Sequence, residues 1–351
     1  ARAGLSADTG STTMSITRRS VLSLLAAAPV LAACGVGGSS PARSGGRQVR
    51  IAYQNFADST LLVKDRGVLE EALPDHEIAW TSFDSGASIN TAFLGGAIDL
   101  AVIGSSPAAA GLCPPLTIPY QVVELLNVIG DSEALVVRKA SGVTDIKGLV
   151  GRKVAAPFGS TAHYSLLAAF QQAGVDPASV TLVDLEPQNI QAAWQRGDID
   201  AAYVWTPVLS VLQQDGLTLT DSAELAAAGK PTLTFTVARR EFVERNGDVL
   251  EKWLAATDDA IKKIKNEPRV VAEAVARQIG ASVDDALSQL KQNIYVDHAE
   301  QLGPGYFGTA DAPGELAGQL RATAEFLHGQ RKVEAVPDLA TFRAALRAPR
   351  G

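Results

Sequence analysis

The chain has 351 residues, of which 46% are hydrophobic and 20% charged, so it can bury sizeable cores in two domains. Its formal net charge of −7 repels nucleic-acid backbones and anionic membrane surfaces, which excludes nucleic acid as the expected partner. The two cysteines, Cys34 and Cys113, are too few for a disulfide framework or a cysteine zinc site. We expect neither a metal nor a cofactor.

The N-terminal segment has the pattern of an export signal. Met14 is the only methionine and is interpreted as the initiator, so residues 1–13 are left out of the fold prediction. Two arginines, Arg18 and Arg19, precede an apolar run of eleven residues from Val21 to Leu31. A helix that spans a bilayer needs about 20 residues, so the run predicts a secretory signal and not a membrane span.

The signal region, residues 1–34, ends in a segment that resembles a bacterial lipobox. The sequence LAAC closes at Cys34, the residue that such a motif makes the lipidated mature N-terminus. Residues 17–22 also resemble a twin-arginine signal, so export by that route or by the general route both stay open. Residues 35–47 are rich in Gly and Ser and predict a flexible tether. These patterns favour a protein that is lipid-anchored at the outer face of the cytoplasmic membrane, or periplasmic. An ordinary cleaved signal with an incidental cysteine is the alternative.

From Val49 onward, short apolar runs alternate with helical patterns. This alternation predicts an α/β fold with largely parallel strands. The predicted strands are 49–54, 77–83, 98–104, 125–130, 133–138, 153–158, 180–185, 199–205 and 232–239. The predicted helices include 88–94, 162–173, 190–196 and 206–214.

Two of these strands, 133–138 and 232–239, bracket a central block with its own alternation. They are interpreted as crossings between two lobes, lobe 1 comprising 48–136 and 237–351 and lobe 2 comprising 137–236. After Arg240 the pattern is helix after helix, and we expect these helices to cover lobe 1. Two α/β lobes joined by two crossings are typical of a hinged receptor that closes on a solute.

Small polar residues stand where predicted strands give way to helices. The segments are 83–89, 104–107 and 158–167, together with Gln54 after the first strand. Helix starts of this kind offer N–H groups and hydroxyls to an anion. Because the segments contain no Lys or Arg, the pattern favours a diffuse monoanion such as a sulfonate over a phosphate. Ordinary helix capping by Ser or Thr is the alternative.

Two acids could supply the opposite charge. Glu133 opens a crossing strand, and Asp200 lies five residues before Trp205. If they line the cleft they favour a ligand cation, which an aromatic ring would also attract. The alternative is a solvated Glu133, a turn-capping Asp200 and a core Trp205.

Several longer stretches resemble one known family. FDSGASI, SEALVV, GSTAHYSLLAA and AAWQRGDIDAAYVWTP resemble the substrate-binding proteins of taurine ABC transporters, within the larger sulfonate, nitrate and thiamine-precursor group. The resemblance runs from about Val49 to Arg240. It implies a two-lobed periplasmic-binding-protein fold of type II that captures a small sulfonate and delivers it to a membrane permease and its ATPase. We expect a monomer.

The resemblance also implies roles for individual residues. The implied sulfonate contacts are Ser85 with Gly86, Ser106, and Ser160 with Thr161, followed in the same turn by His163 and Tyr164. Glu133 and Asp200 are the implied amine partners, Trp205 packs against the ligand, and Gln54 contributes from the first loop.

Two alternative functions stay open. The ligand could be an amine-free alkanesulfonate or a sulfate ester. From another class, an exported hydrolase could use His163 beside Ser160 and Ser165. The chain contains no GxSxG, HExxH or glycine-rich phosphate loop, which disfavours an enzyme.

Overall fold

The computed structural model of the chain describes residues 47–348. The predicted signal region with Cys34, and all of the predicted tether except Arg47, lie outside the described residues. Within them, no helix combines the length and the apolar character needed to cross a membrane.

The strands of the described residues form two sheets. The first has the order β11-β4-β10-β3-β1-β2 and the second the order β7-β6-β8-β5-β9. The strands of the first sheet are β1 (Arg47–Gln54), β2 (His76–Phe83), β3 (Leu100–Gly104), β4 (Tyr120–Val128), β10 (Leu233–Arg239) and β11 (Ile294–Tyr295). Those of the second are β5 (Glu133–Arg138), β6 (Lys153–Ala156), β7 (Thr181–Asp184), β8 (Ala201–Trp205) and β9 (Gly216–Asp221).

Both sheets follow the same plan. In the first, β1 pairs in parallel with β2 and β3, and β10 runs antiparallel between β3 and β4. In the second, β6 pairs in parallel with β7 and β8, and β5 runs antiparallel between β8 and β9. In each sheet the strand that enters from the other sheet, β10 or β5, runs antiparallel to both of its neighbours, and the short β11 is also antiparallel to β4. The carboxyl ends of parallel strands are where α/β proteins place their ligands.

The predicted crossing strands do not themselves cross. β5 pairs only within the second sheet and β10 only within the first, so the chain passes between sheets at residues 129–132 and 228–232. The predicted boundaries at 136/137 and 236/237 are therefore wrong, because each falls inside a strand. An apolar run shows that a strand forms but not which sheet it joins. Below, the first lobe is residues 47–130 with 232–348, and the second lobe is residues 131–231.

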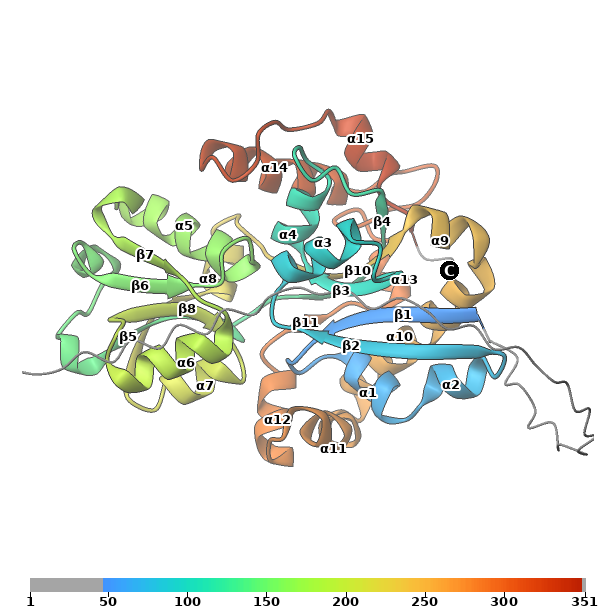
Figure 1. Cartoon of the computed structure of the whole chain (residues 1–351), viewed down its shortest axis with the longest axis horizontal. Helices are drawn as coiled ribbons and strands as arrows, with labels where there is room; N and C mark the ends of the chain where they lie inside the picture. The colour runs from blue at the N-terminus through green and yellow to red at the C-terminus, as the bar shows by residue number, and fades with distance from the viewer. Residues whose placement is uncertain (1–46, 349–351) are drawn as a thin grey trace, which may run out of the picture. The chain divides into compact units, whose positions relative to one another are not determined.

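Helices cover the faces of both sheets (Figure 1). Those of the first lobe before the crossing are α1 (Ser59–Asp65), α2 (Val68–Ala72), α3 (Gly86–Leu94) and α4 (Ser105–Gly111). The second lobe has α5 (Thr161–Ala173), α6 (Pro187–Arg196), α7 (Val208–Leu212) and α8 (Ser222–Ala227), with short 3₁₀ turns at Lys139–Ser141, Ile146–Leu149 and Pro177–Ser179. The C-terminal helices are α9 (Arg240–Arg245), α10 (Gly247–Asn266), α11 (Pro268–Ile279), α12 (Val283–Leu290), α13 (His298–Gln301), α14 (Leu316–Gly329) and α15 (Leu339–Ala344).

The C-terminal helices cover the first lobe, as predicted. α10 buries residues spaced three or four apart, among them Trp253 and Ile261, and packs with α1 and α11 on one face of the first sheet. α14 packs with α4 on the other face through Leu320 and Ala324. The same region also touches the second lobe, because Phe326 packs edge-on against Tyr164 with ring centroids 4.8 Å apart.

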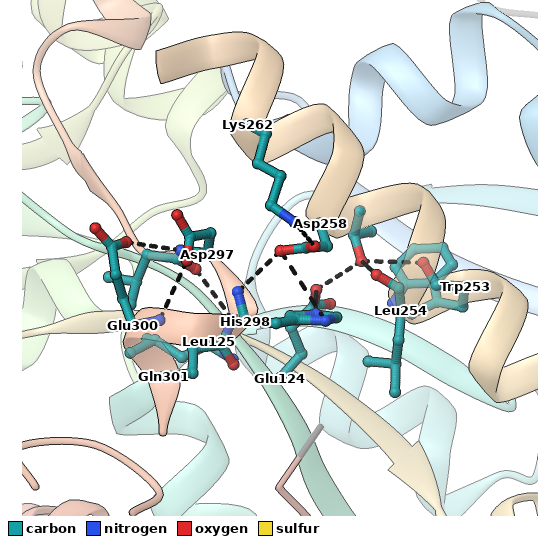
Figure 2. A network of polar contacts seen from close by, with 12 residues as sticks. Glu124, Leu125, Trp253, Leu254, Asp258, Lys262, Asp297, His298, Glu300 and Gln301 are labelled. Carbon is teal, nitrogen blue, oxygen red and sulfur yellow. Dashed lines mark hydrogen bonds and ion pairs between the residues drawn. The ribbon is translucent and has the colours of Figure 1, made fainter. Parts of the chain in front are cut away.

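A buried polar network ties the C-terminal helices to the first sheet (Figure 2). Glu124 of β4 is fully buried. Its carboxylate accepts hydrogen bonds from Thr257 Oγ1 at 2.6 Å and Thr236 Oγ1 at 2.9 Å, and His298 Nε2 lies 3.0 Å from its Oε1. Asp258 Oδ1 lies 4.0 Å from His298 Nδ1. The network joins β4, β10, α10 and α13.

Candidate ligand-binding site

A pocket lies between the two lobes, with a volume of about 40 Å³, which suits only a small solute. The first lobe contributes Gln54, Phe56, Ala57, Gly86, Gly104, Pro107, Ile129, Thr234 and Asn293 to its wall. The second lobe contributes Ser132, Glu133, Ser160, Thr161, Trp205 and Thr206. The wall is formed where parallel strands β1, β3 and β8 end and where antiparallel strand β5 begins.

The pocket contains six of the predicted site residues and not the other five. Gln54, Gly86, Glu133, Ser160, Thr161 and Trp205 line it. Ser85, Ser106, His163, Tyr164 and Asp200 are not among its lining residues.

Glu133 is a buried carboxylate in the pocket wall. It pairs in register with Trp205 across β5 and β8. Thr161 Oγ1 donates to its Oε1 at 2.5 Å and Ser222 Oγ donates to its Oε2 at 3.4 Å. Burial raises the pKa of Glu133 to about 7. Among the described residues no Lys, Arg or His forms an ion pair with Glu133, so only hydroxyl groups stabilise its negative charge.

Ser160 begins helix α5 at the pocket wall. Its Oγ accepts from the His163 N–H at 3.2 Å and donates to Pro157 O at 2.6 Å, so the hydroxyl serves as a helix cap. The capping alternative therefore accounts for this hydroxyl. The first turn of a helix still offers backbone N–H groups without intrahelical acceptors, and α5 presents that turn to the pocket.

Ser85 caps helix α3 and does not line the pocket. It forms a capping box with Ser88, and its Oγ donates to Glu186 Oε1 of the second lobe at 2.8 Å. Gly86, the next residue, does line the pocket. A Cβ at Gly86 would lie 2.4 Å from Pro107 Cγ, so glycine lets α3 and α4 approach each other there.

Three other predicted contacts have different surroundings. Ser106 is buried in the first turn of α4, and its hydroxyl has no partner among the described residues. His163 stacks on Phe158 at 4.3 Å, and its Nδ1 accepts from the Gly159 N–H. Burial lowers the pKa of His163 to about 3, so the ring is neutral at physiological pH. Tyr164 faces α14 of the first lobe.

The structure places Asp200 away from the pocket, so its predicted role beside Glu133 is wrong. Asp200 precedes the first residue of β8, and Glu133 pairs with Trp205 at the other end of that strand. Five strand residues span about 17 Å. Asp200 Oδ2 accepts from the Lys153 N–H at 2.8 Å, and Arg152 lies 3.8 Å from Oδ1. Its side chain fastens β6 to β8.

Sequence reasoning missed several lining residues. Thr234 lies inside a predicted strand and Thr206 follows Trp205, so both could have been found from the strand ends. Asn293 has no comparable signal. Its Oδ1 accepts from the Gly130 N–H at 3.0 Å and from Ser132 Oγ at 2.6 Å, which fixes the first crossing segment against the C-terminal region.

The two α/β lobes share the same order of strands, and a small polar pocket lies between them at the ends of those strands. This arrangement defines a two-lobed solute-binding protein. The chain belongs to the family described as the substrate binding domain of ABC-type glycine betaine transport systems, whose model matches residues 47–280. The predicted fold class and the resemblance to ABC-transporter binding proteins are confirmed.

Individual proteins of this kind are similar over most of the chain. The taurine-binding periplasmic protein of Escherichia coli K12 is 37% identical over 295 residues, which are 82% of this chain and 88% of that protein. A putative aliphatic sulfonates-binding protein of the same strain is 28% identical over 85% of this chain and 89% of that protein. The alkanesulfonate-binding protein SsuA of Xanthomonas axonopodis pv. citri, solved with MOPS bound, shares the fold with a TM-score of 0.71, at 22% identity, over 87% of this chain and 99% of that chain.

The fold by itself does not separate binding from catalysis. The desulfurization enzyme DSZB shares it, with a TM-score of 0.60 and 15% identity over 85% of this chain and 96% of that chain. In the present chain, the described residues show no hydrogen bond between the His163 ring and the hydroxyl of Ser160 or Ser165. Ser165 Oγ instead lies 3.3 Å from Ser222 Oγ. The hydrogen bond between nucleophile and base that the hydrolase alternative would use is not formed among the described residues.

Proposed function

We propose that this protein captures taurine or a related small aminosulfonate between its lobes and delivers it to the permease and ATPase of an ABC importer. The observation that carries the proposal is Glu133, a buried pocket carboxylate that the described residues leave without a cationic partner. A ligand ammonium supplies the missing charge. The similarity to a taurine-binding protein supports the same ligand class.

The two ends of such a ligand call for different partners. A sulfonate suits neutral donors, and the first turn of α5 supplies N–H groups at the wall beside Ser160 and Thr161. An amine-free sulfonate brings an anion toward Glu133 with no cation to compensate, so the carboxyl must first take up a proton. Because Asp200 lies elsewhere, Glu133 alone carries the preference for an amine. The sulfate-ester and alkanesulfonate alternatives predict the opposite preference.

The proposal includes export and membrane attachment. The LAAC segment supports lipidation at Cys34 and a position at the outer face of the cytoplasmic membrane or in the periplasm. Similarity to a periplasmic relative supports export. We propose that the protein acts as a monomer.

Calorimetry on unfolded and refolded protein tests the ligand class. Taurine is expected to bind in the micromolar range or more tightly, and ethanesulfonate about 100-fold more weakly, because only taurine compensates Glu133. Equal affinities would refute the aminosulfonate assignment, and failure of both ligands would refute sulfonate capture. Mass spectrometry of the incubated ligands checks that they are returned chemically unchanged, as capture without catalysis requires.

Gly104 offers a test of lobe closure around the ligand. A Cβ at this first-lobe residue would lie 2.6 Å from Cγ2 of Thr161 in the second lobe, and Thr161 is held by Glu133. Gly104→Ala is therefore expected to hold the lobes apart and to lower the affinity for taurine about tenfold, which is equivalent to about 1.4 kcal/mol of binding free energy. Gly305→Ala is the control, because nothing lies within 4 Å of a Cβ there. An unchanged affinity in Gly104→Ala would show that the lobes do not approach this closely when ligand binds.

A further inference from the structure

The two lobes are joined by a hydrogen bond outside the pocket. Ser85 Oγ, at the start of α3 in the first lobe, donates to Glu186 Oε1, at the start of α6 in the second lobe, at 2.8 Å. Neither residue lines the pocket. This bond forms only when the lobes are together, so any motion that opens the pocket at this edge must break it.

Glu186 is poorly compensated in this position. Its Oε2 is buried and has no hydrogen-bond partner among the described residues. The charged groups that face it are Asp84, beside Ser85 in the first lobe, and Asp184, at the end of β7 in its own lobe. Both are acids, and Asp184 Oδ1 is already engaged by the Phe158 N–H. The favourable electrostatic influences on the carboxylate are the Ser85 hydrogen bond and the N-terminal end of α6.

We propose that Glu186 is a positioning residue that sets ligand affinity from outside the pocket, because the lobes close more readily when its carboxyl is protonated. The inference rests on the proposed function only in the choice of taurine as the ligand. It identifies a determinant of closure and adds no ligand contact.

The physical reason is that closure of the lobes removes water from the Glu186 carboxylate, which already lies near two other acids. With the lobes apart, water solvates the carboxylate. With the lobes together, one oxygen gains a single hydroxyl donor while the other loses water and gains nothing. Accordingly, burial first, and then the charges of Asp84 and Asp184, raise the pKa of Glu186 in the closed arrangement, against the opposing effect of the Ser85 hydrogen bond.

The sign of the pH dependence follows from this. The closed arrangement has the higher carboxyl pKa and so binds more protons than an open one. Closure is therefore favoured as pH falls from neutral through the raised pKa, and the gain is complete near the ordinary glutamate value of about 4.3. Glu133 also titrates, so the ratio of wild-type to variant affinity is the informative quantity, in which the contribution of Glu133 cancels.

Glu186→Gln tests the inference by calorimetry with taurine between pH 4.5 and 8. Gln keeps an oxygen to accept from Ser85 but carries no charge, so its affinity is expected to be about three- to tenfold tighter than wild type at pH 7. The ratio should approach one at pH 4.5. Glu224→Gln is the matched control, because Glu224 accepts from Thr220 Oγ1 at 2.8 Å within the second lobe. Its affinity should equal wild type throughout.

A second pair of measurements keeps the test independent of the ligand and of folding. Ser85→Ala alone also removes a helix cap, so the coupling is read from a double-mutant cycle of Ser85→Ala with Glu186→Gln. Small-angle scattering of ligand-free protein should show a smaller radius of gyration for Glu186→Gln than for wild type at pH 7. A weaker or unchanged taurine affinity at pH 7, or a ratio that is flat with pH, overturns the inference. If taurine binds to neither protein, the proposed function fails, and an unchanged radius of gyration then overturns the closure role as well.

Discussion

Glu133→Gln is expected to weaken taurine binding by about 100-fold or more, while ethanesulfonate affinity stays equal or improves. The variant keeps the size of the side chain and one oxygen to accept from Thr161, while its NH2 group replaces the oxygen that accepts from Ser222, and it removes the charge that a ligand ammonium would meet. For an amine-free sulfonate the same change removes a repulsion. Calorimetry with both ligands at pH 8 measures the two effects on one protein.

The pH dependence of wild-type affinity is part of the same prediction. Burial raises the pKa of Glu133 to about 7 in the ligand-free pocket, whereas an ammonium requires the ionised form. Binding therefore releases a proton, and below pH 7 the Glu133 contribution to taurine affinity should fall about tenfold per pH unit. Glu133→Gln should lack this dependence, and the ratio of the two affinities isolates it from that of Glu186.

Asp200→Asn is the matched control for charge. It also neutralises an acid of the second lobe, but one that fastens β6 to β8 at the far end of the strand. Its taurine affinity should match wild type. The site with a single carboxylate would be refuted if Asp200→Asn lowered the affinity for taurine as strongly as Glu133→Gln does. It would also be refuted if Glu133→Gln lowered the affinities for taurine and ethanesulfonate equally.

Local pattern was enough to predict nine of the eleven strands of the described residues and four of the six second-lobe residues of the pocket wall. Each predicted strand overlaps an observed one, and 133–138 has the observed bounds of β5. β9 was missed because its residues, GLTLTD, are half polar and follow closely on a helix, and β11 has only two residues. Strand ends carry positional information, so Gln54, Glu133 and Trp205 could be assigned to the wall.

Pairings between distant residues could not be predicted in this way. Ser85 has the local pattern of a ligand-binding cap, yet its hydroxyl is engaged by Glu186, 101 positions away. Asp200 is the amine partner that the family resemblance implied, but the length of β8 separates it from Trp205 and Glu133. Asn293 reaches the wall through a topology that no local motif reveals. Each of these errors concerns which partner a polar group finds, which only the packing of the lobes determines.

His298→Ala is expected to lower the free energy of unfolding by about 3–5 kcal/mol at pH 5.5, because it leaves Glu124 as a buried charge without its cation. The Glu124 carboxylate is fully buried, and Figure 2 shows His298 lying between it and Asp258. Thr236 and Thr257 would remain as hydroxyl donors but carry no charge. Chemical unfolding followed by tryptophan fluorescence measures the change, since Trp253 lies in the same core.

The loss of unfolding free energy caused by His298→Ala should become smaller as pH rises. Burial alone would lower the pKa of His298, but the hydrogen bond and charge of Glu124, with the charge of Asp258, outweigh it and raise the pKa above its ordinary value. A histidine whose pKa is raised by folding stabilises fully below the unfolded value of about 6.5, and that contribution is lost as pH rises through the folded pKa. The difference in unfolding free energy between wild type and His298→Ala should therefore shrink from pH 5.5 to pH 8.5.

His328→Ala, at an exposed position near the end of α14, is the control and should lower the free energy of unfolding by less than about 0.5 kcal/mol at either pH. A cost for His298→Ala that is the same at both pH values would mean that folding leaves the pKa of His298 unshifted. A cost that grows with pH would mean that the imidazole is held neutral in the folded protein, and that the network in Figure 2 stabilises by hydrogen bonding without an ion pair.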